Sequence, residues 1–85
     1  MDMLKYNYYN KKEVRRMTIS ARNQLKGTVT EIKEGAVNAI VSIDIGNGNV
    51  IKSTVSLDAV KELGLTVGKA AYAVIKATSV MVAVD

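Results

Sequence analysis

Residues 37–49 read VNAIVSIDIGNGN, a stretch that predicts a β-hairpin. Every odd position from 37 to 45 is aliphatic, whereas the even positions between them are mostly polar. This alternation is typical of a strand with one buried face. The Asn47-Gly48 pair that follows suits a two-residue type I′ turn, because both central residues of that turn need a positive φ. Beyond the turn, the inward-facing positions of a second strand resume at Ile51, Val55 and Leu57.

The segment before the hairpin predicts a strand that bends. Leu25, Gly27 and Val29 share a period of two, but Ile32 falls out of phase with them. A change of phase within one strand indicates a β-bulge. Gly35 is expected to end this strand.

A short helix is expected after the hairpin, where the period changes. Leu57, Val60 and Leu63 recur every three residues and form one apolar stripe. Ser56 suits the N-cap position, and Gly64 suits the residue after the helix.

Two further strands are expected at about residues 70–76 and 79–84, and both are apolar on both faces. A strand of this kind needs cover on both faces, and so small a body has no second layer of its own. A second subunit is the most economical cover, so we expect an oligomer. Three strands, a helix and two strands follow the order of an OB-type barrel. The predicted fold is therefore all-β: a small five-stranded OB-like barrel with one short helix between the third and fourth strands.

The chain has 85 residues, enough for one domain. Residues 1–16 hold five basic and two acidic residues and three of the four tyrosines, whereas residues 17–85 carry a net charge of only +1. We predict a flexible basic extension, residues 1–16, ahead of one domain, residues 17–85. No apolar run is long enough to span a bilayer, and the first residues lack a signal-peptide core, so we expect a cytoplasmic protein without a membrane partner.

Catalysis is not expected, because the sequence contains neither Cys nor His. The nucleophile and the general base that enzymes use most are therefore missing, as are thiolate and imidazole ligands for a metal cation. The acidic residues of the domain stand singly, without the spacing of an acid–base pair. We predict no catalytic residue and no direct ligand to a metal cation. The Gly46-x-Gly48 pair lacks the third glycine and the following helix of a dinucleotide loop.

Nucleic-acid binding is a natural alternative for an OB-type barrel, but the domain does not favour it. Such surfaces need aromatic platforms in a basic groove, and Tyr72 is the domain's one aromatic residue. What remains are small groups that suit a tetrahedral anion: hydroxyls, backbone N–H groups and a lysine. Each also has an ordinary structural explanation: Ser56 as a helix cap, Arg22 as a surface ion-pair partner and Lys76 as a charge that solvates a strand end. Ser20 and Arg22, two residues apart on the expected strand, would share a face.

Three stretches carry a resemblance to a known family: TISARNQLKG at 18–27, STVSLDAVKELGL at 53–65 and VIKATSVM at 74–81. In this order and at this spacing they resemble the molbindins, the Mop family of molybdate-binding or molybdenum-pterin-binding proteins, whose domain is TOBE-like. The resemblance covers residues 17–85.

The resemblance implies a homohexamer, built as a trimer of dimers, that binds molybdate and tungstate at subunit interfaces for intracellular molybdenum storage and homeostasis. The bound oxyanion is then the only cofactor-like group. The residues carried over as oxyanion-binding are Ser20, Ala21, Arg22 and Asn23 from the first stretch, Ser56 from the second, and Lys76, Ala77 and Thr78 from the third. Ala59 is a departure, because many relatives have Ser there and its hydroxyl can donate to the anion.

Two other functions stay open at this point. One is an OB-type nucleic-acid-binding module that uses the basic N-terminal tail. The other is a pure assembly module whose anion sites are vestigial.

Overall fold

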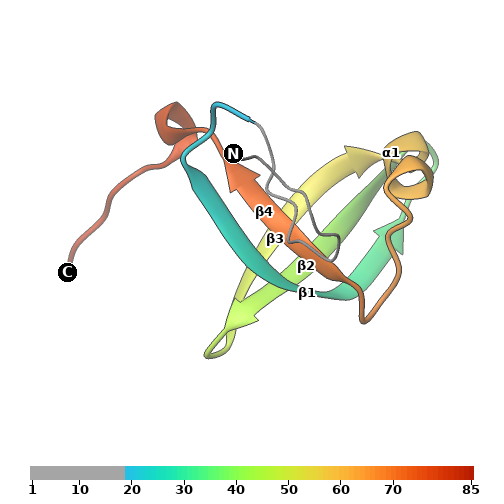
Figure 1. Ribbon diagram of the computed structural model, residues 1–85, viewed down its shortest axis with the longest axis horizontal. Helices are drawn as coiled ribbons and strands as arrows, with labels where there is room; N and C mark the ends of the chain where they lie inside the picture. Colours follow the sequence, from blue (N-terminus) through green and yellow to red (C-terminus); the bar gives the residue numbers. More distant parts are fainter. Residues whose placement is uncertain (1–18) are drawn as a thin grey trace, which may run out of the picture.

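The computed structural model describes residues 19–85, which fold around one curled antiparallel sheet (Figure 1). The four strands lie in the order β3-β2-β1-β4, so that β3 and β4 are the edges of the sheet. The elements are β1 (Asn23–Glu34), β2 (Asn38–Gly46), β3 (Asn49–Ser56), α1 (Leu57–Glu62), β4 (Ala70–Ile75) and the 3₁₀ turn η1 (Ala77–Ser79). The predicted 1–16 extension lies outside the described residues.

The hairpin forms where the sequence predicted it. Asn47 and Gly48 connect β2 to β3 with φ of 54° and 79°, the positive values that a type I′ turn requires. The pairing register shifts between Asp44 and Gly46, and the Asp44 side chain accepts a hydrogen bond from the Gly46 N–H at 2.8 Å. The turn therefore closes on a small bulge that the side chain of Asp44 stabilises.

β1 bends, as its broken period predicted, and it pairs along both of its edges. The register with β2 skips one residue between Val29 and Glu31, which confirms a bulge at Thr30. Thr28 is paired with Asp44 of β2 on one side and with Ala70 of β4 on the other. One long strand therefore joins two halves of the sheet and curls it toward a barrel.

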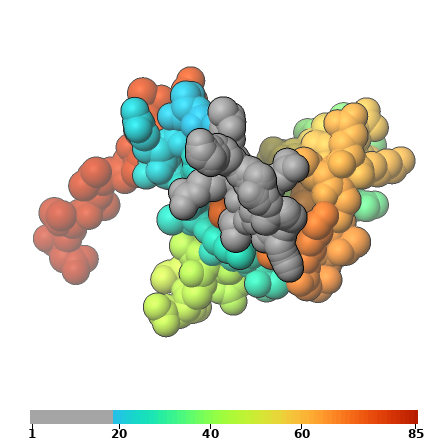
Figure 2. All heavy atoms as spheres, in the orientation of Figure 1, coloured from blue at the N-terminus to red at the C-terminus, as the bar shows by residue number. Residues whose placement is uncertain are grey.

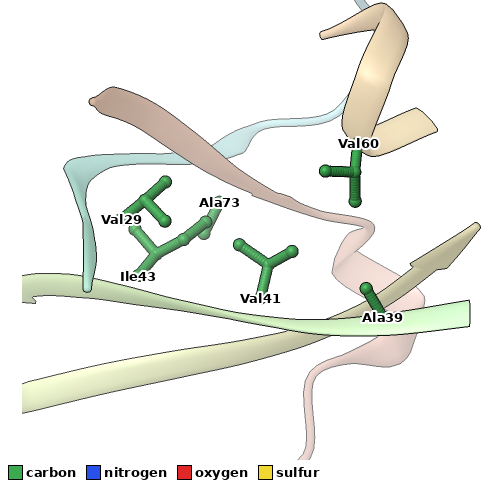
Figure 3. Packing of buried hydrophobic residues seen from close by; sticks show 6 residues of the cluster. All are labelled: Val29, Ala39, Val41, Ile43, Val60 and Ala73. Carbon is green, nitrogen blue, oxygen red and sulfur yellow. The ribbon is translucent and has the colours of Figure 1, made fainter. Parts of the chain in front are cut away.

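Six buried residues form the core: Val29, Ala39, Val41, Ile43, Val60 and Ala73. Figure 3 shows them converging from β1, β2, α1 and β4 between the walls of the curled sheet. Because all six are small aliphatics, the interior is narrow, and a large aromatic side chain would not fit there.

The helix α1 covers one end of this core through Val60. The Ser56 hydroxyl caps it by accepting a hydrogen bond from the Ala59 N–H at 3.0 Å. Gly64, with φ of 63°, ends it, and the Lys69 ammonium donates to the Leu63 and Gly64 carbonyls. The predicted stripe is only partly right, because Leu63 is 61% exposed and does not join the core.

The fifth strand is the one part of the fold prediction that was wrong for the single chain. We expected a strand at residues 79–84; instead, η1 turns the chain after β4, and residues 80–85 leave the body without pairing (Figures 1 and 2). Val82 and Val84 are 90% and 91% exposed. The all-β, OB-like architecture with one short helix is confirmed, with four strands in place of five, because no surface of this chain lies beside the last segment.

No helix within residues 19–85 has the length and apolar character needed to cross a membrane.

The close approach of β1 to β2 at Gly27 gives a stability prediction. A Cβ built at Gly27 would lie 2.4 Å from the Asp44 carbonyl oxygen and 2.8 Å from the Ile43 Cγ2. We expect Gly27→Ala to lower the free energy of unfolding by about 1–3 kcal/mol, because the two strands must move apart. Denaturant unfolding at a fixed protein concentration measures it. Lys26→Ala, the exposed neighbour, serves as the control and should change it by less than about 0.5 kcal/mol. Equal stability of both variants would contradict this role for Gly27.

Candidate functional site

The structure brings the first and third motifs together at one end of the sheet. β1 and β4 are antiparallel, and Asn23 at the start of β1 is the register partner of Ile75 at the end of β4. Ser20, Ala21 and Arg22 lead into this pair, and Lys76, Ala77 and Thr78 lead out of it. Figure 1 shows η1 next to the start of β1. Seven of the eight predicted residues therefore share one end of the molecule.

Two side-chain amides hold the first motif in place. The Asn23 side-chain N–H₂ donates to the Ile75 carbonyl at 3.3 Å and links β1 to β4 beyond their backbone pairing. The Gln24 side-chain N–H₂ donates to the Ala21 carbonyl at 2.8 Å. Asn23 thus supports the junction of β1 and β4 beside the first motif, and its part in oxyanion binding stays a prediction. Sequence reasoning missed Gln24, although it stands within the first motif, because a side chain that bonds three residues back along an irregular segment leaves no periodic signal.

The backbone of the first motif differs from the expected strand. Residues 20–22 are bends and irregular chain, and β1 begins only at Asn23. The prediction that Ser20 and Arg22 share a strand face was therefore wrong. The physical reason is the Gln24 contact, which bonds the Ala21 carbonyl locally and leaves it unpaired with a neighbouring strand. Ser20 and Arg22 are exposed, while Ala21 is half-buried.

The third motif is a turn whose first amides are free to donate outward. In η1 the Ser79 N–H bonds the Lys76 carbonyl at 2.9 Å and the Val80 N–H bonds the Ala77 carbonyl at 3.2 Å. The N–H groups of Ala77 and Thr78 come first in the turn and have no acceptor inside it. The methyl side chain of Ala77 leaves these amides accessible.

The two motifs at this end of the sheet carry positive charge and no negative charge. Arg22 and Lys76 bring two cations, and neither motif, at 18–27 or at 74–81, contains an acidic residue. Within the described residues, moreover, no three acidic side chains gather into a cluster that could hold a metal cation. Exposed N–H and O–H donors beside two cations can bind an anion by charge-assisted hydrogen bonds.

Ser56 is the predicted residue that the structure does not bring to this end. It pairs with Asn38 at the start of β2, which adjoins the far end of β1. The twelve residues of β1, roughly 40 Å of extended chain if straight, separate Ser56 from Asn23. Its hydroxyl oxygen already accepts from the Ala59 N–H, so its own proton remains available for donation. One chain alone therefore cannot unite all three motifs.

Residues 19–82 match the TOBE domain. Over 69 residues the sequence is 74% identical to the probable molybdenum-pterin-binding protein of Haemophilus influenzae, and this match covers 81% of the present chain and 100% of that protein. The chain belongs to the TOBE-domain family of molybdenum-pterin-binding proteins.

Solved structures of this molybdenum-pterin-binding (Mop) family share the fold. MopII from Clostridium pasteurianum is 51% identical and superimposes with a TM-score of 0.74 over 79% of this chain and 100% of its own. The cytoplasmic molybdate-binding protein ModG, solved with molybdate bound, is 52% identical with a TM-score of 0.69, over 72% of this chain and 43% of the ModG chain. These likenesses confirm the predicted family and OB-like fold of the present Mop protein.

The cap at Ser56 gives a prediction that separates its structural role from any role toward a ligand. Ser56→Ala should cost about 1 kcal/mol in the free energy of unfolding, because the Ala59 N–H loses its acceptor. Ser56→Asp should keep the stability, because a carboxylate caps equally well and favours the helix N-terminus. Denaturant midpoints of the two variants and the parent, at equal concentration, test it. If both variants lose the same free energy of unfolding, the hydrogen bond from the Ala59 N–H to the side chain of residue 56 does not stabilise α1.

Proposed function

We propose that this Mop protein binds molybdate, and tungstate through the same groups, and so stores and buffers the oxyanion inside the cell. The observation that carries the proposal is the β1–β4 pairing, which gathers two cations, two hydroxyls and free amides at one end of the sheet. The family membership and the molybdate-bound ModG structure support it. We propose binding without catalysis, and a cytoplasmic location, the one stated for ModG.

The chemistry of the anion fits these groups. Molybdate is a tetrahedral dianion with four acceptor oxygens. Lys76 and Arg22 would offset its charge, while the Ser20 and Thr78 hydroxyls and the amides around Ala21 and Ala77 would replace its water. Each charge-assisted hydrogen bond contributes about 1.5–3 kcal/mol, so a few of them suffice for tight binding. Discrimination against sulfate, equal in charge and shape, would then depend on the size of the cavity.

We further propose that the sites are completed between subunits of a homohexamer, a trimer of dimers. Within one subunit, Ser56 lies at the opposite end of the sheet from the first and third motifs. Only Ser56 of another subunit could therefore face these two motifs. Apolar side chains exposed along β4 and residues 80–84 supply a surface that favours association. Binding and assembly would then be linked by mass action.

The domain, residues 17–85, carries the proposed function without residues 1–16, since the three motifs lie within it. Nucleic-acid binding through the basic tail remains the alternative. In the described residues Tyr72 is the one aromatic side chain, so no stacking platform supports that alternative there.

Lys76 provides the sharpest test of the oxyanion site. Removing it should leave the charge of a bound dianion less compensated, so Lys76→Ala should weaken molybdate binding about 30- to 1000-fold, a loss of roughly 2–4 kcal/mol. Calorimetry with molybdate, repeated with sulfate, measures the change. Lys61→Ala, an exposed lysine on α1, controls for net charge. If parent, Lys76→Ala and Lys61→Ala all bind molybdate equally, Lys76 is not a ligand. A small equal loss in both variants would indicate diffuse electrostatics only.

The proposed assembly predicts a native mass spectrum with six chains per particle. Adding molybdate should add oxyanion mass to that hexamer, and none to a single chain, if residues of two subunits complete each site. A monomer at micromolar concentration would overturn the assembly. A monomer that carries molybdate would overturn the sharing of sites between subunits.

A further inference from the structure

The turn between β2 and β3 is the one place in the chain where an asparagine is followed directly by a glycine. The side-chain amide carbon of an asparagine is an electrophile, and the backbone nitrogen of the next residue is a nucleophile within reach. Attack of that nitrogen closes a five-membered ring. A side chain on the next residue crowds the attack, and glycine has none. Asn47 and Gly48 are therefore the pair in this sequence best suited to react.

The structure leaves both reacting groups accessible. Asn47 and Gly48 are exposed, and Figure 1 shows their turn at the outer tip of the hairpin. No hydrogen bond between described residues holds the Asn47 side chain or the Gly48 N–H, and the side-chain bond at this turn goes instead from the Gly46 N–H to Asp44. A Cβ built at Gly48 meets nothing within 4 Å. The tip therefore has room for the ring to close and for water to enter.

The other asparagines among the described residues lack this combination of features. Asn23 and Asn38 precede larger residues than glycine, and the Asn23 side chain is held by its hydrogen bond to β4. Asn49 is also exposed, but it lies in β3 and precedes Val50, whose branched side chain crowds the attacking nitrogen. Asn49 therefore provides an internal control, two residues after Asn47 in the same hairpin.

We propose that Asn47 is a site of spontaneous modification in the folded protein, where aspartate and isoaspartate form and the isoaspartate disrupts the hairpin. The Gly48 nitrogen bonds to the Asn47 Cγ and loses its proton, while the bond from Cγ to the side-chain nitrogen breaks and ammonia leaves. Water then opens the succinimide ring. Opening at Cγ gives aspartate, and opening at the backbone carbonyl gives isoaspartate. One water is taken up for each ammonia released. The inference does not rest on oxyanion binding.

The two products should affect the hairpin differently. Aspartate, like asparagine, accepts the φ of 54° found at Asn47, and an Asp-Gly pair also suits a type I′ turn. Isoaspartate instead routes the backbone through the side chain and adds one methylene to it. The two-residue turn fixes the register of β2 and β3, beginning with Gly46 opposite Asn49. A longer backbone no longer closes this turn, so the isoaspartate form should loosen β3, an edge of the sheet.

Peptide mapping of the aged protein tests the site. The full chain is incubated at mildly alkaline pH and digested with trypsin, which releases residues 34–52 with Asn47 and Asn49 in one peptide. Tandem mass spectrometry should show Asn47 converting about 10-fold faster than Asn49 or more, because Gly48 does not crowd the attack. Asn47→Gly keeps a pair that suits the turn and should abolish the fast conversion. Equal rates at Asn47 and Asn49 would overturn the proposal.

The same chain unfolded in guanidinium chloride separates the effect of the folded turn from that of the dipeptide alone. We expect Asn47 to convert in the folded protein as well as in the unfolded chain, since its turn is exposed at the tip of the hairpin. If Asn47 converts quickly only when the chain is unfolded, the turn protects it, and the proposed modification of the folded protein is wrong.

Thermal unfolding of the separated products tests the effect on the hairpin. Ion exchange separates the charged forms, and methylation by an isoaspartyl methyltransferase identifies the isoaspartate form. At equal protein concentration this form should unfold at a lower temperature than the parent, whereas Asn47→Asp should unfold close to the parent. The same unfolding temperature for the isoaspartate form and for Asn47→Asp would refute the proposed disruption.

Discussion

The pairing of β1 on both of its edges is the constraint on which the rest of the structure depends. A flat strand could not bond β2 and β4 and still enclose a core; the bulge at Thr30 and the missing side chain at Gly27 let it turn. The loop before β4 extends the pairing along β1. The Gly68 N–H donates to the Val29 carbonyl at 2.7 Å, and the Val29 N–H donates to the Lys69 carbonyl at 2.9 Å. Val29 itself is fully buried at this point. The curl, the core and the neighbourhood of the two motifs all follow from this one strand.

The same pairing divides the predicted site residues into two groups. Antiparallel register places the start of β1 beside the end of β4, so motifs more than fifty residues apart in sequence meet. The register with β2 and β3 sends Ser56 to the other end by the same geometry. The separation is therefore a property of the sheet and not of a loop that could swing. Any site that uses all three motifs has to draw on more than one chain.

Local chemistry explains which parts of the structure could be predicted from sequence. The Asn47-Gly48 turn and the Ser56 cap each depend on a few neighbouring residues, and both formed as expected. The bulge at Thr30 also left a local trace, the broken period between Val29 and Ile32. By contrast, the bends at Ser20 and Arg22 depend on where one amide of Gln24 finds an acceptor. Whether residues 80–85 form a paired strand depends on which surface lies beside them in space. A pattern of alternating valines does not specify that surface.

The exposure of the site residues in one chain is itself an argument for linkage between assembly and binding. Arg22, Lys76 and Thr78 are all exposed, so their hydrogen bonds to an anion would compete with bulk water. The same donors contribute much more where water is excluded, because the effective dielectric constant falls. A second subunit that covers this end would exclude water and add donors in one step. If the proposed interface forms there, the affinity of the oxyanion site is a property of the assembled protein, and the surfaces that join the copies control it as directly as the ligands do.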